Sequence, residues 1–350
     1  MCAQESRRNV SLVFAWEGLP TCIYGLPKAR SHVPFCFVIG HMKTRIWIAL
    51  LAIYLIWGST YLAIRYAVGT IPPLLMAGTR FLIAGAVLFI WRWFVGDPLP
   101  TRRQWGSAAV IGLLLLLGGN GLVSWSEKHV PSGIAALLIG SVPLFMVIIE
   151  AMRRGGIKPG WLSILGLVTG FGGIVLLVGP DEMIGAETQY NLLAVGALLL
   201  ASLLWSIGSV YSKTADLPVS SLMGTGMEML CGGVGLYLVG TFFGEWQALH
   251  ISSITPQSWL ALAYLIVFGS MMGFVAYAWL LRHAPVSLVA TYAYVNPVVA
   301  IGLGAWIGQE HLDPRTIIAA LIIISSVILI NSSRQSRIIH QDEIASPAAE

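Results

Sequence analysis

Long stretches without a charged residue alternate with short stretches in which charges gather. The uncharged stretches run over 46–64, 106–126, 131–149, 159–178, 188–212, 251–281, 284–309 and 316–333. A helix needs about 20 apolar residues to cross the hydrocarbon core of a bilayer. Apolar and polar residues do not alternate within these stretches, as they would in the strands of a membrane β-barrel. The pattern therefore predicts membrane-spanning helices.

Two further stretches, 72–95 and 218–243, are long enough to span although each contains one deep charge, Arg80 or Glu228. With them the sequence predicts an all-α membrane protein of ten transmembrane helices. Composition agrees, because 57% of the 350 residues are hydrophobic and 10% are charged, against about 25% charged in soluble proteins. We therefore expect the bilayer to be the solvent of this chain.

The two ends of the chain differ from the rest. Residues 1–45 form an N-terminal tail with short apolar patches, and Met42, followed by Lys43, resembles a natural start, so 1–41 is interpreted as an overextended start or a tail without function. The order of segments in a signal peptide is absent there. Residues 334–350 form a second tail.

Lysines and arginines indicate the orientation. With the N-terminus in the cytoplasm, the basic residues of the loops divide unevenly, and cytoplasmic loops carry an excess of such residues. Both termini are therefore predicted to be cytoplasmic. The inner set is Lys43, Arg45, Arg92, Arg102, Arg103, Arg153, Arg154, Lys158, Lys213, Arg282, Arg334 and Arg337, and the outer set is Arg65, Lys128 and Arg315.

An internal repeat relates residues 46–180 to residues 188–333, with five predicted spans in each. The matched pairs at an offset of 148 or 154 are Trp57 with Trp205, Arg65 with Lys213, Gly85 with Gly233, Arg80 with Glu228, His129 with His283, Pro131 with Pro285, and Pro143 with Pro297. An odd number of spans in each repeat inverts the second copy. Inverted repeats are the architecture that permits alternating access.

Several motifs resemble the EamA repeats of the drug/metabolite transporter superfamily. They are Leu-Ile-Trp-Gly-Ser-Thr-Tyr at 55–61, Ala-Gly-Thr-Arg-Phe-Leu at 77–82, Val-Pro-Ser-Gly-Ile-Ala-Ala at 130–136, Ser-Val-Pro-Leu-Phe at 141–145, Thr-Tyr-Ala-Tyr-Val-Asn-Pro-Val at 291–298 and Gly-Gln-Glu at 308–310. The resemblance covers about residues 46–333, and it implies a permease of the inner membrane. It also implies that spans five and ten pack peripherally around a site built from the other spans.

Arg80 and Glu228 are the first candidates for a functional site, because a charge deep in the membrane is costly. Three roles stay open for them: a structural ion pair between the repeats, contact with a solute, and proton coupling. Further candidates are the amides Asn120 and Asn296, the aromatic residues Trp57, Tyr61, Trp205, Tyr211, Tyr292 and Tyr294, and helix breaks at Pro143 and Pro297.

The sequence has no phosphate-binding loop, no paired-cysteine or His-Glu-x-x-His spacing, and no serine-nucleophile motif. We therefore expect no metal, no cofactor, no nucleic acid and no enzyme activity. The favoured function is secondary-active or facilitative export of a small metabolite, such as an amino acid, a nucleoside or a drug-like solute, by a monomer or homodimer. The alternatives are a binding or scaffold protein of the membrane and, less favoured, a lipid-modifying enzyme.

Overall fold

A computed structural model describes residues 35–152, 159–178, 191–284, 286–289 and 291–345. The chain divides into two units, Met1–Met42 and Lys43–Glu350, and the second unit contains the membrane-spanning segments. The expectations for residues 1–34, and those for Arg153, Arg154 and Lys158, lie outside the described residues.

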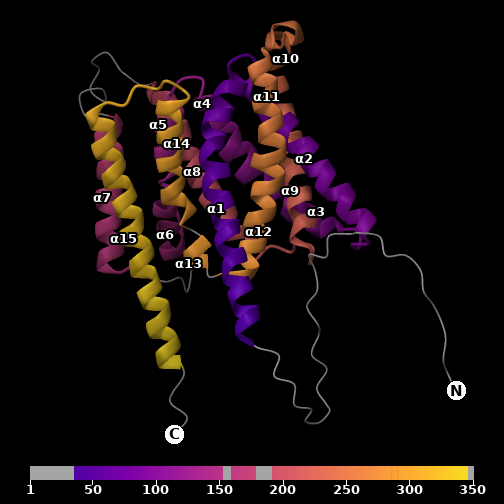
Figure 1. The fold of residues 1–350 in the computed structure, drawn as a ribbon. Coiled ribbons are helices and arrows are strands. Elements are labelled where there is room, and N and C mark those ends of the chain that lie inside the picture. The colour runs from indigo at the N-terminus through magenta and orange to yellow at the C-terminus, as the bar shows by residue number, and fades with distance from the viewer. Residues whose placement is uncertain (1–34, 153–158, 179–190, 285, 290, 346–350) are drawn as a thin grey trace, which may run out of the picture. The chain divides into compact units, whose positions relative to one another are not determined.

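The first half of the described chain is helical throughout (Figure 1). Its elements are α1 (Phe35–Val68), α2 (Pro73–Val95), α3 (Arg102–Gly112), the π-helix η1 (Leu113–Gly121), α4 (Leu122–Ser126), α5 (Ser132–Ile139), α6 (Val142–Met152) and α7 (Trp161–Val178).

The second half is also built from helices. It consists of α8 (Leu192–Ser212), α9 (Ser221–Phe242), α10 (Glu245–Ala248), the 3-10 helix η3 (Ile251–Ser253), α11 (Pro256–Tyr264), the π-helix η4 (Leu265–Met272), α12 (Gly273–His283), α13 (Val286–Val289), α14 (Tyr292–Trp306) and α15 (Pro314–Ala345). The described residues contain no strand, so the all-α prediction is confirmed. α15 continues into the predicted C-terminal tail.

In the part of the chain that the structure describes, seven helical segments are long and apolar enough to cross a membrane. Three shorter apolar helices, Trp161–Leu177, Val295–Trp306 and Pro314–Ile330, overlap the other three predicted spans. A membrane protein with several spanning helices is therefore confirmed, whereas the total of ten crossings stays a prediction.

Local sequence signals set where several helices begin. Thr101 and Gln104 form a capping box at the start of α3, and Asn191 caps α8 by accepting from the amides of Leu193 and Ala194. α2 and α11 each carry proline in the first turn, where the missing N–H has no intrahelical acceptor. Capping groups of this kind satisfy amides that the helix itself leaves unpaired.

The two halves begin at opposite ends of the helices. Arg65, close to the end of α1, donates to the carbonyl of Val130 (2.7 Å), and Ser126 donates to the carbonyl of Ala194 (3.1 Å), close to the start of α8. The end of α1 and the start of α8 therefore lie together. We call this end of the unit, away from Lys43, the distal end.

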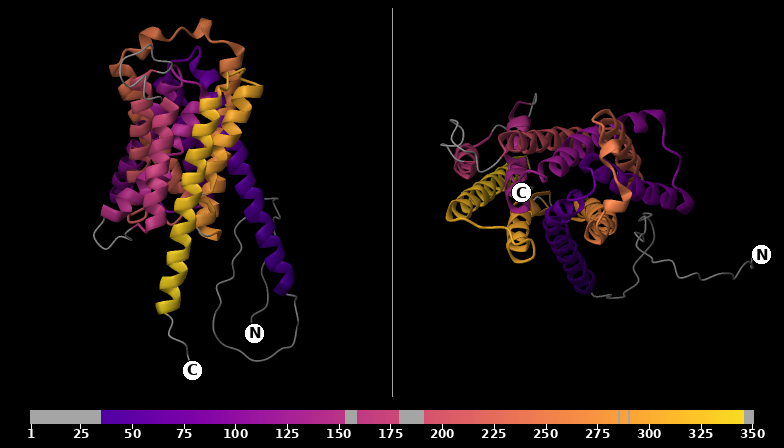
Figure 2. Two further views of the ribbon diagram at one scale, coloured as in Figure 1. Left: turned by 90° about the vertical axis from the view of Figure 1, so that its left-hand side faces the viewer. Right: turned by 90° about the horizontal axis from the view of Figure 1, so that it is seen from above.

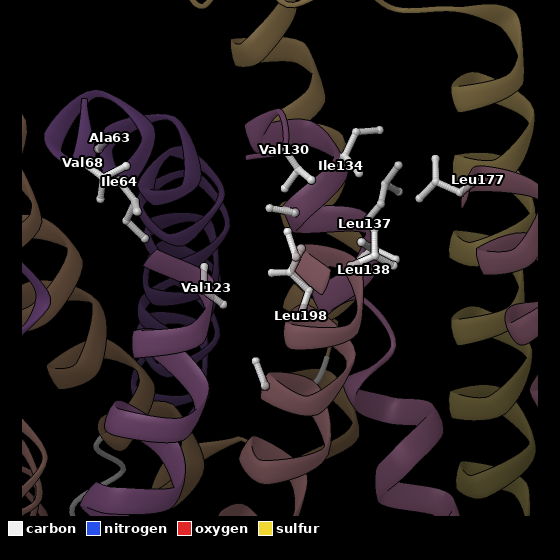
Figure 3. Close-up of a cluster of buried hydrophobic side chains, with 14 of the residues drawn as sticks. Ala63, Ile64, Val68, Val123, Val130, Ile134, Leu137, Leu138, Leu177 and Leu198 are labelled. Carbon is white, nitrogen blue, oxygen red and sulfur yellow. The ribbon is translucent and has the colours of Figure 1, made fainter. Parts of the chain in front are cut away.

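The largest buried cluster joins helices of both halves. Figure 3 shows side chains from α1, α4, α5, α7 and α8 in this cluster, among them Ile64, Val123, Leu138 and Leu198. Leu138 and Leu198 have no exposed surface. The cluster therefore fixes the halves against each other.

Small residues allow α9 to lie against α2 and α3. A Cβ atom on Gly85 would lie 2.9 Å from the carbonyl oxygen of Gly226, and one on Gly112 would lie 2.9 Å from the amide nitrogen of Gly232. Close backbone approach at glycines is typical of helix pairs in membranes. These glycines therefore set the distance of α9 from α2 and α3.

α7 and α15 lie side by side at one edge of the unit (Figures 1 and 2). Gly166 of α7 faces Ile330 and the carbonyl of Ser326 in α15. These helices correspond to predicted spans five and ten. Their position agrees with the peripheral packing that the family resemblance implies.

A partly buried ion pair ends α2. The guanidinium of Arg92 donates to both carboxylate oxygens of Asp97, at 2.8 and 2.7 Å, and Gly96 between them has φ +99°. The hydrogen bonds from Arg92 hold the pKa of Asp97 below its ordinary value. A carboxyl group with a lowered pKa in the folded state stabilises the fold above its ordinary pKa and loses this effect as the pH falls through the lowered value.

We expect Asp97→Asn to lower the stability of the purified protein by about 1 kcal/mol at neutral pH, since a bidentate pair is lost at a partly exposed site. Thermal unfolding in detergent measures the effect. The difference between variant and wild type should shrink as the pH falls below about 4, because the stabilisation is lost between the ordinary pKa of aspartate and the lowered pKa of the folded state. An unchanged difference at low pH would contradict this role of the pair.

Candidate functional site

A cavity lies between the two halves. It is lined by α1, α2, η1, α4, α5 and α6 of the first half and by α8, α12 and α14 of the second. Neither α7 nor α15 contributes a residue to it. The predicted candidates among its lining residues are Trp57, Tyr61, Arg80, Asn120, Trp205, Tyr292, Asn296 and Pro297.

Trp57 lies at the centre of an aromatic group in this cavity. Its ring centroid lies 5.3 Å from that of Phe274 and 5.2 Å from that of Tyr292, both with edge-to-face geometry, and 5.1 Å from that of Tyr277. Its indole N–H donates to the carbonyl of Gly269 (3.2 Å). Edge-to-face pairs stabilise aromatic clusters, so this wall of the cavity has a fixed shape.

Arg80 brings a positive charge to the cavity. Its Nε donates to the hydroxyl of Ser270 (2.6 Å), and its guanidinium lies 4.8 Å from the ring centroid of Phe81. Within the described part of the chain it forms no ion pair. A buried guanidinium whose partners are a hydroxyl and a ring retains donors for an anionic group.

Two π-helices lie at equivalent places in the two halves: η1 lines the cavity, and η4 binds two side chains that line it. η1 contains Asn120, whose amide donates to the carbonyl of Leu115 (3.4 Å), and η4 contains Gly269 and Ser270. The wider turn of a π-helix is frequent at functional sites. In η4 this turn supplies the carbonyl that binds Trp57 and the hydroxyl that binds Arg80.

The second amide, Asn296, is 5% exposed, and its side-chain oxygen has no hydrogen-bond partner among the described residues. Asn296 is part of α14 and precedes Pro297, which lies inside that helix. Pro143 lies in the first turn of α6, directly after the interruption between α5 and α6. The helix in the second half is interrupted before Tyr292 instead, so the matched prolines do not mark matched breaks.

The structure does not bring Glu228 to Arg80. Glu228 lies on α9, where its backbone carbonyl contacts Gly112 of α3, and it does not line the cavity. No ion pair joins it to Arg80 among the described residues. Tyr211 lies near the end of α8, 38% exposed and away from the cavity lining. The side chain of Tyr294 lies outside the described residues.

The predictions from sequence did not include a group of charges at the distal end. Glu310, which follows α14, accepts hydrogen bonds from the amides of Ser132 (2.8 Å) and Gly133 (3.1 Å), and Arg65 lies 3.5 Å from it. Glu127, directly after α4, is buried. Glu310 belongs to the motif at 308–310, but the sequence signal for Glu127 is only a carboxyl group at the edge of an apolar stretch.

The model of the EamA-like transporter family matches residues 44–179 and 192–332. The inner membrane transporter YedA of Escherichia coli strain K12 is 41% identical over 283 residues, which cover 81% of this chain and 89% of that protein. Protein PagO of Salmonella typhimurium is 27% identical over 293 residues, covering 82% and 93%. The matched segments correspond to the two repeats that the sequence predicts.

The transporter sll0355 of Synechocystis is 25% identical over 312 residues, which cover 83% of this chain and 91% of that protein. One solved protein structure superposes with a TM-score of 0.59 at 22% identity. It covers 82% of this chain and 97% of its own. At this identity the similarity concerns the fold alone.

Proposed function

Because the chain belongs to the EamA-like transporter family, we propose that it is a secondary-active or facilitative transporter that exports a small organic solute across the inner membrane. The observation that carries this proposal is the cavity, which both repeats line and which combines aromatic walls with a guanidinium that has no ion-pair partner among the described residues. Pockets with apolar walls and a few fixed polar groups bind small organic molecules.

The arrangement of the repeats supports a mechanism of alternating access. The end of α1 and the start of α8 lie together at the distal end, which supports two repeats of opposite direction. In such an architecture, an exchange of conformation between the repeats opens a central site first to one side and then to the other. With the predicted orientation, both termini are cytoplasmic and the distal end faces the periplasm.

The chemistry of the cavity favours a solute with an aromatic or apolar body and an anionic group. The rings of Trp57, Trp205 and Tyr292 provide the apolar surface, whereas Arg80 would bind the anionic group with charge-assisted hydrogen bonds. The amide of Asn296 adds an acceptor for a solute N–H or O–H. Amino acids, nucleosides and drug-like acids differ in whether they carry an aromatic or apolar body, an anionic group and an N–H or O–H donor.

Everted membrane vesicles from cells that overexpress the chain test the proposal. We expect the vesicles to accumulate at least one member of a panel of amino acids, nucleosides and aromatic carboxylates, measured by mass spectrometry, in excess of vesicles without the protein. The uptake should saturate with solute concentration. If no member of the panel accumulates above the control vesicles, the proposed function is wrong.

A further inference from the structure

Three charged side chains of the distal end come from separate elements. Arg65 lies near the end of α1, Glu127 follows α4, and Glu310 lies between α14 and α15. The guanidinium of Arg65 pairs with Glu310 at 3.5 Å, and one of its nitrogens also donates to the backbone carbonyl of Glu127 (3.4 Å). The guanidinium therefore contacts the carboxylate of Glu310 and the backbone of Glu127.

Glu310 connects the two repeats. Its carboxylate accepts from the amide and the hydroxyl of Ser132 (2.8 and 2.7 Å) and from the amide of Gly133 (3.1 Å). Ser132 and Gly133 begin α5 of the first repeat, whereas Glu310 belongs to the second. A carboxylate at these amides binds the helix N-terminus as a cap does. We call this set of contacts, with the pair to Arg65, the Glu310 closure.

Glu127 lies beside the closure without taking part in it. It is 1% exposed, and neither of its carboxyl oxygens has a hydrogen-bond partner among the described residues. An ionised carboxylate buried without a partner costs several kcal/mol. Burial first, and then the neighbouring carboxylate of Glu310, raise the pKa of Glu127, while Arg65 opposes them. Burial and the charge of Glu310 therefore both favour the protonated form of Glu127 in this conformation.

Glu127 does not itself line the cavity. Val123, one helical turn before it, lines the cavity, and Figure 3 shows Val123 and Val130, the residues on either side of the segment that carries Glu127. The titratable groups around its carboxyl group are Arg65 and Tyr61 of α1, Arg80 of α2 and Glu310. The nearby His129 packs its ring against Trp125 at 5.0 Å.

We propose that Glu127 is a proton-binding site whose charge controls the Glu310 closure. When the O–H bond of Glu127 breaks, the proton passes to water that enters at the distal end, and a carboxylate remains. Arg65 is then drawn from Glu310 to Glu127, because one guanidinium cannot neutralise both. Without Arg65, Glu310 holds the start of α5 less strongly and the distal end opens.

This inference rests on the proposed function for its role in transport, although the closure itself can be measured without a solute. In the predicted orientation, a lower pH outside would protonate Glu127 and favour the closed distal end. Protonation and closure are linked by thermodynamics, since a proton that binds the closed state more tightly stabilises that state. Entry of a proton would thus follow release of the solute.

Hydrogen–deuterium exchange of the full chain in lipid nanodiscs tests the inference. The amides of Ser132 and Gly133 report on the closure, because both donate to Glu310. After correction for chemical exchange, we expect their protection to fall at least roughly tenfold when the pH is raised from about 5 to about 8, because a raised pKa moves the loss of the proton above the ordinary range of a carboxyl group.

Variants identify the titrating group. Glu127→Gln, which stays neutral, should keep both amides protected at every pH, and Glu310→Ala should leave them unprotected at every pH. Lys128→Gln removes the adjacent exposed charge, and its amide protection should change with pH as in the wild type.

Two results would overturn the inference. One is amide protection in the wild type that does not depend on pH, and the other is a Glu127→Gln variant whose protection changes with pH as in the wild type. If the vesicles take up solute but amide protection does not change with pH, the inference is wrong and the proposed function stands. If amide protection changes with pH but no solute is taken up, the inference stands and the proposed function is wrong.

Discussion

Arg80→Gln is expected to reduce uptake of an anionic solute at least roughly tenfold, because hydrogen bonds to a charged group contribute about 1.5–3 kcal/mol and about 1.4 kcal/mol corresponds to a factor of ten. The uncharged variant retains a donor for Ser270, so the wall of the cavity should persist. Initial uptake rates in everted vesicles, at matched protein amounts, measure the effect with the solute that the wild type accumulates.

Two further variants sharpen this test. Arg103→Gln removes a charge whose side chain is 85% exposed and pairs with Asp216, and it should leave the uptake rate unchanged. Arg80→Lys keeps the charge but loses the planar fork that binds a carboxylate with two hydrogen bonds, so an intermediate rate is expected. Equal rates for Arg80→Gln and the wild type would show that Arg80 does not bind the solute.

Gly112→Leu is expected to abolish the folded protein. A Cβ atom at this position would overlap the carbonyl oxygen of Glu228 and lie 2.9 Å from the amide nitrogen of Gly232. Both atoms belong to the backbone of α9, so no change of rotamer relieves the contact. Overpacking costs about 1–3 kcal/mol where side chains can adjust and more where they cannot. We therefore expect a loss of at least about 3 kcal/mol.

Size-exclusion chromatography in detergent, together with thermal unfolding, measures this loss. Gly106→Leu is the matched control, because it lies on the same helix and an added Cβ would meet no atom within 4 Å. The control should elute and unfold like the wild type. A folded Gly112→Leu variant with wild-type stability would mean that the backbones of α3 and α9 are not in contact at Gly112.

The fold class could be predicted from the sequence because uncharged apolar stretches of bilayer length would expose too much apolar surface in a soluble protein. The spacing of Trp57 and Trp205 in the two repeats also pointed to the cavity that both residues line. Such predictions use only the spacing of residues along one helix and the equivalence of two repeats. They do not depend on the direction in which a side chain points.

An ion pair between Arg80 and Glu228, one of the three roles left open for them, is not formed among the described residues. Equivalent positions in two repeats need not face each other. The glycines of α9 pack against α2 and α3, and no residue of α9 lines the cavity. The π-helices were also missed, since no composition signal distinguishes Leu113–Gly121 from an α-helix. The grouping of Glu127 and Glu310 was not predicted, because Arg65, which contacts both residues, lies far from them in the sequence.

The central claim is that the cavity is the path of the solute and opens to each side in turn. Cysteine labelling tests it without a known solute: the four native cysteines are replaced by serine, and Asn120→Cys places a thiol in the cavity lining. Gly172→Cys, where an added Cβ meets no atom within 4 Å, serves as a control outside the cavity. A maleimide that cannot cross membranes is added to intact cells or to everted vesicles. We expect the Asn120→Cys variant to react from both sides, whereas reaction from only one side, or from neither, would contradict the claim.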